Sequence, residues 1–240
     1  MQEPAFVRVA LDTTLIKGIY DTCDQWCMYC PATNRCLAFR CNPDLQHAKQ
    51  NVYRSMAHRL FEGLMFLKCL CEAEGRPTPE IDAMLSDDPR RRAALVEIDD
   101  PLERKAQRYA LVSRAYLTSR PDYPFEMRPR PSGPTPFEVF AWFHVLIAAK
   151  IYRALVSSAD AVRGMEGRRQ DALMSAKVAL IGIDRSLDAL AAMAVELDDP
   201  RHQLLQSHLR RLRREVEARF PEARRVVRAG LDDEPSSTRH

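Results

Sequence analysis

Residues 168–197 read RRQDALMSAKVALIGIDRSLDALAAMAVEL, with apolar side chains on most of the circumference of a helix. A helix that is apolar nearly all round is a buried helix, so we expect this one to lie at the centre of the fold. Within it, Ala176, Ala179 and Gly182 recur at a spacing of three. Small residues on one face let a second helix approach closely, and the stretch therefore predicts a tightly packed helix pair.

Further helical stretches lie on both sides of this one. Apolar periodicity predicts helices at residues 45–74, 102–119, 137–162 and 201–220. Glycine is scarce, with 8 in 240 residues, while 46% of the residues are hydrophobic and 29% charged. This is the composition of a soluble globular protein. We predict an all-α fold, a helical bundle that carries an N-terminal Cys-rich metal-binding loop.

Proline and aspartate mark the ends of the predicted helices. Asp-Asp-Pro triplets begin at Asp87, Asp99 and Asp198, and each places an aspartate at a helix N-cap with proline in the first turn. Residues 121–136 contain six prolines in sixteen residues. Such a stretch forms neither a helix nor a central strand, so it predicts a long connection between two helical layers.

The predicted domain boundaries follow from these stretches. Residues 1–44 form a lead-in and the Cys-rich metal loop, residues 45–230 the helical bundle, and residues 231–240 a disordered tail. The longest apolar run, residues 139–149, is shorter than the roughly twenty residues that span a bilayer. Residues 1–10 show no apolar region of a secretory signal. We expect a cytoplasmic protein with no membrane partner.

The segment CDQWCMYCPATNRCLAFRC, residues 23–41, holds five of the seven cysteines. Disulfides would need an oxidising compartment, and seven is an odd number. A redox dithiol at Cys27 and Cys30 would usually sit on a βαβ unit, which the sequence does not predict. A two-residue gap lets two thiolates converge on one metal, and further cysteines nearby can complete the ligand shell. The segment therefore favours a metal site. The other two, Cys69 and Cys71, lie too far apart around a helix to share one metal easily.

Two families resemble parts of this segment. Residues 27–36, CMYCPATNRC, resemble the [4Fe–4S] loop of the endonuclease III-type DNA glycosylases, although Cys23 lies closer than the first cysteine of that family. That resemblance, over about fourteen residues, implies an iron–sulfur cluster and no glycosylase activity. Cys23, Cys27 and Cys30 are similar to the signature of radical S-adenosylmethionine enzymes. Residues 175–186 faintly resemble an uncharacterised bacterial helical family, which implies no function.

The compact set Cys23, Cys27, Cys30 and Cys36 is our prediction for the metal ligands, with Cys41 as an alternative ligand. The expected cofactor is a [4Fe–4S] cluster, with zinc as the alternative, because spacing alone does not separate them. Arg35 and Arg40 would offset the negative charge of the cluster. Five nearby residues could form ordinary core or exclude water from the cluster: Trp26, Met28, Tyr29, Leu37 and Phe39.

The sequence shows no catalytic constellation, and whether the protein is an enzyme stays open. His58 with Glu62, and Glu138 with His144, do not form the Glu-x-x-His pairs of di-iron bundles.

Asp184 and Asp188 lie one turn apart on the central helix and would need partners if buried. We expect these partners to come from four basic residues: Lys150, Arg153, Lys177 and Arg185.

The C-terminal stretch, residues 201–230, carries nine arginines against three glutamates. This excess permits a nucleic-acid partner, although a solvated helix is the more common explanation. The function predicted overall is iron–sulfur binding with a redox, sensing or accessory role, served by an unknown protein partner or electron donor. The alternatives are structural zinc binding, a radical S-adenosylmethionine-like enzyme and a nucleic-acid-binding module.

Overall fold

The structure, a computed structural model, describes most of the chain outside residues 42–98. The described residues are 12–41, 99–121, 127, 129–197, 199–232 and the isolated positions 68, 72, 75, 77–79 and 82. The chain divides into two compact units, residues 1–49 with 100–240, and residues 50–99. Apart from the isolated positions 68 and 72, the predicted helix 45–74 lies outside the described residues, as do His58, Glu62, Cys69, Cys71 and the triplet at Asp87.

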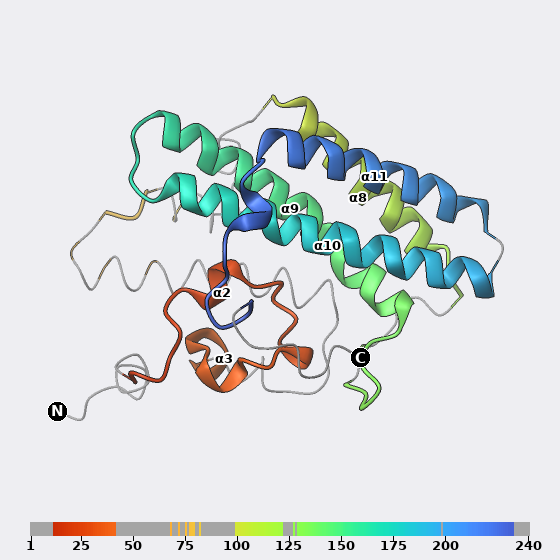
Figure 1. Cartoon of the computed structure of the whole chain (residues 1–240), viewed down its shortest axis with the longest axis horizontal. Helices are drawn as coiled ribbons and strands as arrows, with labels where there is room; N and C mark the ends of the chain where they lie inside the picture. Colours follow the sequence, from red (N-terminus) through yellow and green to blue (C-terminus); the bar gives the residue numbers. More distant parts are fainter. Residues whose placement is uncertain are drawn as a thin grey trace. The chain divides into compact units, whose positions relative to one another are not determined.

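Four long helices dominate the first unit, and the described residues contain no β-strand (Figure 1). The helices are α8 (Pro101–Thr118), α9 (Pro136–Val162), α10 (Arg168–Glu196) and α11 (Pro200–Arg219). Helix α9 packs along α10, α10 along α11, and α8 against both α9 and α11, which closes a four-helix bundle. The predicted all-α class is confirmed.

Local sequence signals begin these helices as expected. Asp100 Oδ1 accepts a hydrogen bond from the Leu102 N–H at 2.8 Å, and Asp199 Oδ1 accepts one from the Arg201 N–H at 2.9 Å. Helix α9 begins with a reciprocal capping box, because the Thr135 hydroxyl accepts from the Glu138 N–H while Glu138 accepts from the Thr135 N–H. Two of the three Asp-Asp-Pro triplets are thus confirmed as helix starts.

The pairing of α9 with α10 depends on a glycine. A Cβ atom added at Gly182 would lie 2.8 Å from Phe143 Cδ1 and 3.0 Å from Ile147 Cγ1. Ala176 and Ala179, on the same stripe, are buried. The predicted small-residue stripe therefore includes a position, Gly182, where α9 packs too closely against α10 to leave room for a side chain.

Helix α9 is the most apolar element of the bundle. By length and composition alone it could cross a membrane, since an 18-residue window within it has a mean hydropathy of 1.6. The helix as a whole thus extends beyond the short apolar run recognised in the sequence. However, 61% of that window is buried inside the structure, as in the core helix of a soluble protein.

The cysteine segment, defined from here on as residues 12–41, belongs to the same unit as the bundle. It contains α2 (Ile19–Thr22), two 3₁₀ turns, η1 (Cys27–Tyr29) and η2 (Thr33–Arg35), and α3 (Leu37–Cys41). Ile19, Ala32 and Cys36 form its small core, and Leu231 from the C-terminal end packs against that core. Helix α2 contacts α10.

The C-terminal end is tied down beside this segment. After α11 and the 3₁₀ turn η3 (Ala223–Arg225), Asp232 forms ion pairs with Lys177 at 2.6 Å and Arg228 at 2.8 Å. A Cβ at Gly230, where φ is +71°, would lie 2.1 Å from Ile16 Cδ1. Because both the backbone angle and the space favour glycine, the chain can close tightly over Ile16.

Candidate metal centre

Short turns bring the cysteines to one side of the segment. Gly18, with φ of 70°, precedes α2, and Gln25 takes a left-handed φ of 58° between Cys23 and Cys27. The two 3₁₀ turns that follow end at Cys30 and Cys36. The backbone therefore reverses direction repeatedly within fourteen residues, which is what allows distant cysteines to face a common space.

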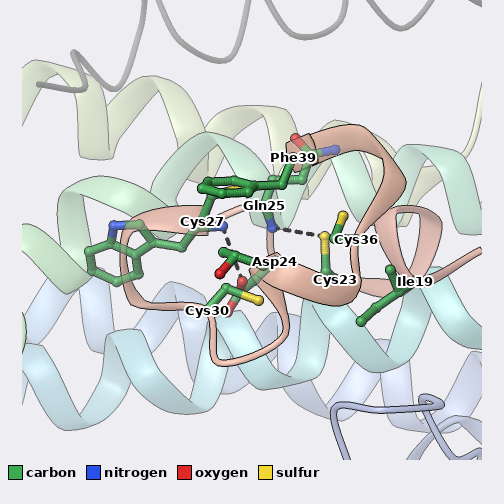
Figure 2. A pocket seen from close by; sticks show the side chains of 10 residues that line it. Ile19, Cys23, Asp24, Gln25, Cys27, Cys30, Cys36 and Phe39 are labelled. Carbon is green, nitrogen blue, oxygen red and sulfur yellow. Dashed lines mark hydrogen bonds between the residues drawn. The ribbon is translucent and has the colours of Figure 1, made fainter. Parts of the chain in front are cut away.

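That space is a small cavity of about 20 Å³ that is partly open to solvent. Cys23, Cys27, Cys30 and Cys36 all line it, whereas Cys41 does not (Figure 2). The remaining lining residues are Ile19, Asp24, Gln25, Trp26, Thr33 and Phe39. The structure thus places all four predicted ligands around one pocket and leaves out the alternative.

Backbone amides approach two of the sulfur atoms. The Gln25 N–H donates to Cys23 Sγ at 3.4 Å, as the dashed line in Figure 2 shows. The Ala32 N–H likewise donates to the sulfur of Cys30, and this bond acts to lower the pKa of that thiol. Hydrogen bonds to sulfur stabilise the thiolate form, which is the form that binds metal.

Removal from water acts in the opposite direction. Burial raises the pKa of the Cys23 thiol to about 12, Asp24 adds to the rise, and Lys150 opposes it. Burial also raises the pKa of Cys30 and of Cys41. At neutral pH these three thiols keep their protons, so metal binding at Cys23 and Cys30 would have to displace protons.

The cysteine side chains are suitable metal ligands by their chemistry, but their positions do not form a ligand shell. Within the described ranges, no three Cys, His, Asp or Glu side chains lie close enough together to hold a metal ion as placed. The five cysteines of the segment are free thiols with no disulfide. A metal or cluster would therefore need the cysteine side chains to turn further into the pocket that four of them already line.

Aromatic rings connect the pocket to the bundle. Trp26 lines the pocket, is 3% exposed and stacks on Trp142 of α9, with ring centroids 5.1 Å apart and planes 7° from parallel. Tyr29 and Phe143 contact Trp26 edge-on. The Trp142 indole N–H donates to the Asp24 carbonyl at 3.0 Å. Trp26 therefore serves as pocket wall and as anchor at once.

The charges near the pocket differ from those predicted. Arg40 pairs with Asp12 at 2.6 Å, and Arg35 Nε donates to the Thr14 carbonyl at 3.4 Å. Both arginines therefore contact the start of the cysteine segment. A buried cation that acts on Cys23 is Lys150 of α9, which the sequence had suggested as a partner of acidic residues on α10. Its burial could have been inferred from the sequence, because Lys150 lies within a strongly apolar helix.

The proposed carboxylate pair on α10 is wrong. Asp188 is exposed, and Asp184 is only half-buried. Asp184 pairs with Arg224 at 2.8 Å and lies 3.5 Å from Arg213, and none of the four predicted basic partners contacts it. The rotation of α10 turns both carboxylates away from the core.

The four predicted partners bind other groups instead. Lys150 donates to the Asp21 carbonyl, Arg153 pairs with Asp171, Lys177 with Asp232, and Arg185 with Asp24.

Glu138 and His144 have separate structural roles. Glu138 belongs to the capping box of α9, where it also contacts Arg130. His144 is fully buried, with Nδ1 2.7 Å from the Ala141 carbonyl.

The C-terminal arginines are partly neutralised by neighbours. Arg211 pairs with Glu215, Arg224 with both Asp184 and Glu217, and Arg228 with Asp232. This pairing reduces the positive excess that the sequence alone suggests for a nucleic-acid face.

No protein-family model matches the chain, and no curated protein or solved structure shows significant similarity to it. The functional argument therefore rests on the pocket itself.

Proposed function

We propose that this protein binds one [4Fe–4S] cluster through Cys23, Cys27, Cys30 and Cys36 and has a redox, sensing or accessory role. The observation that carries the proposal is the pocket lined by these four cysteines and not by Cys41. One thiolate for each iron completes the ligand set of such a cluster. When bound, the cluster would supply one-electron transfer or a covalent link across the segment.

The residues around the pocket each have a part in this proposal. The Gln25 and Ala32 amides donate to sulfur and so lower the energy of the thiolates. Trp26 and Phe39 form apolar walls that exclude water and so influence the redox potential. The stacked contact between Trp26 and Trp142 holds the cysteine segment on the bundle.

Zinc is the alternative occupant, because the same four thiolates can bind one zinc ion tetrahedrally. A radical S-adenosylmethionine-like enzyme would use three cysteines and leave one iron open. The presence of Cys36 in the pocket favours four ligands over three. A redox role would need an electron donor, and a sensing or accessory role a partner protein.

Anaerobic purification of the full chain tests the occupant. We expect a brown protein with broad absorbance near 400 nm and about four irons and four sulfides per chain. A colourless protein with about one zinc would instead assign a structural site. A protein that carries neither, and takes up neither on reconstitution, would overturn the proposal.

Paired variants test the ligand assignment. Cys30→Ser should lose the metal, whereas the matched control Cys41→Ser should keep it, because Cys41 does not line the pocket. The measurement is metal content per chain after purification under identical conditions. The reverse result, metal lost in C41S and kept in C30S, would show that the ligand set is wrong.

The protein contains its own optical reporter of the site. The chain has two tryptophans: Trp26 lines the pocket, and Trp142 stacks on Trp26. Intrinsic fluorescence should therefore be strongly quenched by an absorbing iron–sulfur cluster and recover when a chelator removes the iron. Zinc, which absorbs no visible light, should leave most of the emission in place.

A further inference from the structure

Lys150 is a buried cation inside the bundle. It lies on α9 and is only 4% exposed. Its Nζ donates to the Asp21 carbonyl at 3.2 Å. Cys23 Sγ lies 3.5 Å from the preceding carbonyl, that of Tyr20. The ammonium group and the first predicted ligand thus meet at neighbouring carbonyls at the end of α2.

The nearby carboxylates are committed to another residue. Arg153, one turn further along α9, pairs with Asp171 at 2.6 Å and approaches Asp21 at 3.6 Å. Asp171 also accepts a hydrogen bond from Ser157 at 2.5 Å. For Lys150, no carboxylate of the described residues lies within ion-pair distance.

A buried ammonium group without an anionic partner destabilises a protein. Removing one charge from water costs several kcal/mol, and a paired charge recovers much of that cost. Burial accordingly lowers the pKa of Lys150; negative charge at Cys23, Asp21 and Asp171 opposes this shift, and the positive charge of Arg153 adds to it. The arrangement leaves Lys150 better stabilised when thiolates are present than when the pocket holds four neutral thiols.

The metal centre supplies such an anion. Four thiolates around Zn²⁺ carry a net charge of −2, and four thiolates around a [4Fe–4S]²⁺ core carry the same charge. Either occupant would place negative charge near Lys150.

We infer that Lys150 is the buried counter-charge of the metal centre, a residue outside the cysteine motif that raises the affinity of the pocket for thiolate-bound metal. The inference rests on the proposed function. It predicts opposite effects of removing the charge: the loaded protein loses stabilisation, and the empty protein does not.

Zinc affinity of the reduced, empty full chain tests the inference by competition with a chromophoric chelator at fixed pH. Lys150→Met, similar in length and apolar, should lower the affinity by about 10- to 100-fold, as loss of an outer-shell partner typically does. The melting temperature of the empty K150M chain should stay unchanged or rise, because an unpaired buried charge has been removed.

Two further variants separate charge from hydrogen bonding and from general effects. Lys150→Gln can still donate to the Asp21 carbonyl but carries no charge, and its affinity should fall as in K150M. Lys105→Met removes a lysine that pairs with Glu215 at 2.7 Å between α8 and α11. Its zinc affinity should equal that of the wild type.

Each result decides a different question. Wild-type zinc affinity in K150M, or affinity retained in K150Q, would overturn the counter-charge while leaving the proposed function in place. An equal loss of stability in the empty and loaded K150M chains would assign Lys150 to packing alone. A wild-type chain that takes up neither zinc nor iron would overturn the proposed function, and this inference with it.

Discussion

The cysteine segment and the helical bundle are stabilised in different ways. The bundle buries large side chains completely, among them Tyr109, Phe140, Ile147 and Leu190. Burial of each such aliphatic or phenylalanine side chain contributes about 1.5–3 kcal/mol. The cysteine segment has a core of Ile19, Ala32 and Cys36, assisted by partly buried neighbours. A core this small cannot hold a segment of thirty residues by itself.

The difference shows what the segment depends on. Its largest buried ring, Trp26, packs into the bundle, and its core is closed by Leu231 from the far end of the chain. Contacts from outside therefore replace an internal core. A metal bound to four of its cysteines would add the cross-link that small domains commonly need.

The largest effect is expected where the two regions meet. Trp142→Ala removes a side chain that is 1% exposed and stacks on Trp26, and such truncations cost about 3–5 kcal/mol. It also leaves Trp26 as the sole tryptophan, so fluorescence then reports the cysteine segment while circular dichroism reports the helices. In urea the fluorescence transition of W142A should precede the dichroism transition.

The matched control keeps a ring at this position. Trp142→Phe should retain most of the stacking, and its two transitions should stay close together. Coincident transitions in W142A would mean that the cysteine segment does not depend on this contact, and the comparison of the two regions would need revision.

A smaller effect should appear in the bundle alone as pH falls. Burial lowers the pKa of His144 to about 4, against an ordinary value of 6.5. Below pH 6.5, therefore, His144 binds a proton in the unfolded chain, whereas in the folded chain it binds one only near pH 4. The stability is fully present above pH 6.5 and lost as pH falls, by about 2–3 kcal/mol at pH 4.5.

His144→Asn isolates this contribution, because the other histidines remain in both chains. Urea unfolding at pH 7.5 and 4.5 should show a larger loss of unfolding free energy in the wild type than in H144N. Equal losses would indicate that His144 is protonated in the folded bundle.

The smallest effect concerns a helix cap remote from the pocket. Asp100→Ala removes the hydrogen bond to the Leu102 N–H at the start of α8, which should cost about 1 kcal/mol. Thermal melting should detect a drop of a few degrees, with metal content unchanged. A loss of metal in D100A would show that the bundle and the pocket are coupled more widely than their contacts indicate.

Much of the bundle could be predicted because its signals are local. Apolar periodicity located helices α8 to α11 to within one or two residues. Asp100 caps α8 and Asp199 caps α11, as expected. The small residue Gly182 likewise marks a close contact between α10 and α9. Periodicity could not set the rotation of α10 finely enough to decide whether Asp188 is buried, and the structure places it outside.

The candidate site divides in the same way. Spacing along fourteen residues selected Cys23, Cys27, Cys30 and Cys36 as one set, because residues so close in sequence can reach a common point whatever surrounds them. That a metal binds there, either a [4Fe–4S] cluster or zinc, stays a prediction. The prediction that Arg35 and Arg40 offset the negative charge of a cluster also came from nearness in sequence. In the structure Arg40 pairs with Asp12, and Arg35 donates to the Thr14 carbonyl.

By itself, then, the sequence determined the helices, their caps and the set of cysteines that can act together, because each depends on neighbours within a few turns of chain. Only the tertiary structure decided that Trp26 stacks on Trp142, that Leu231 closes the segment's core, and that Lys150 lies buried beside Cys23. These contacts join residues about one hundred or more positions apart. The rotation and packing of the helices decide which of these distant side chains meet. Residue spacing along the chain does not predict such contacts.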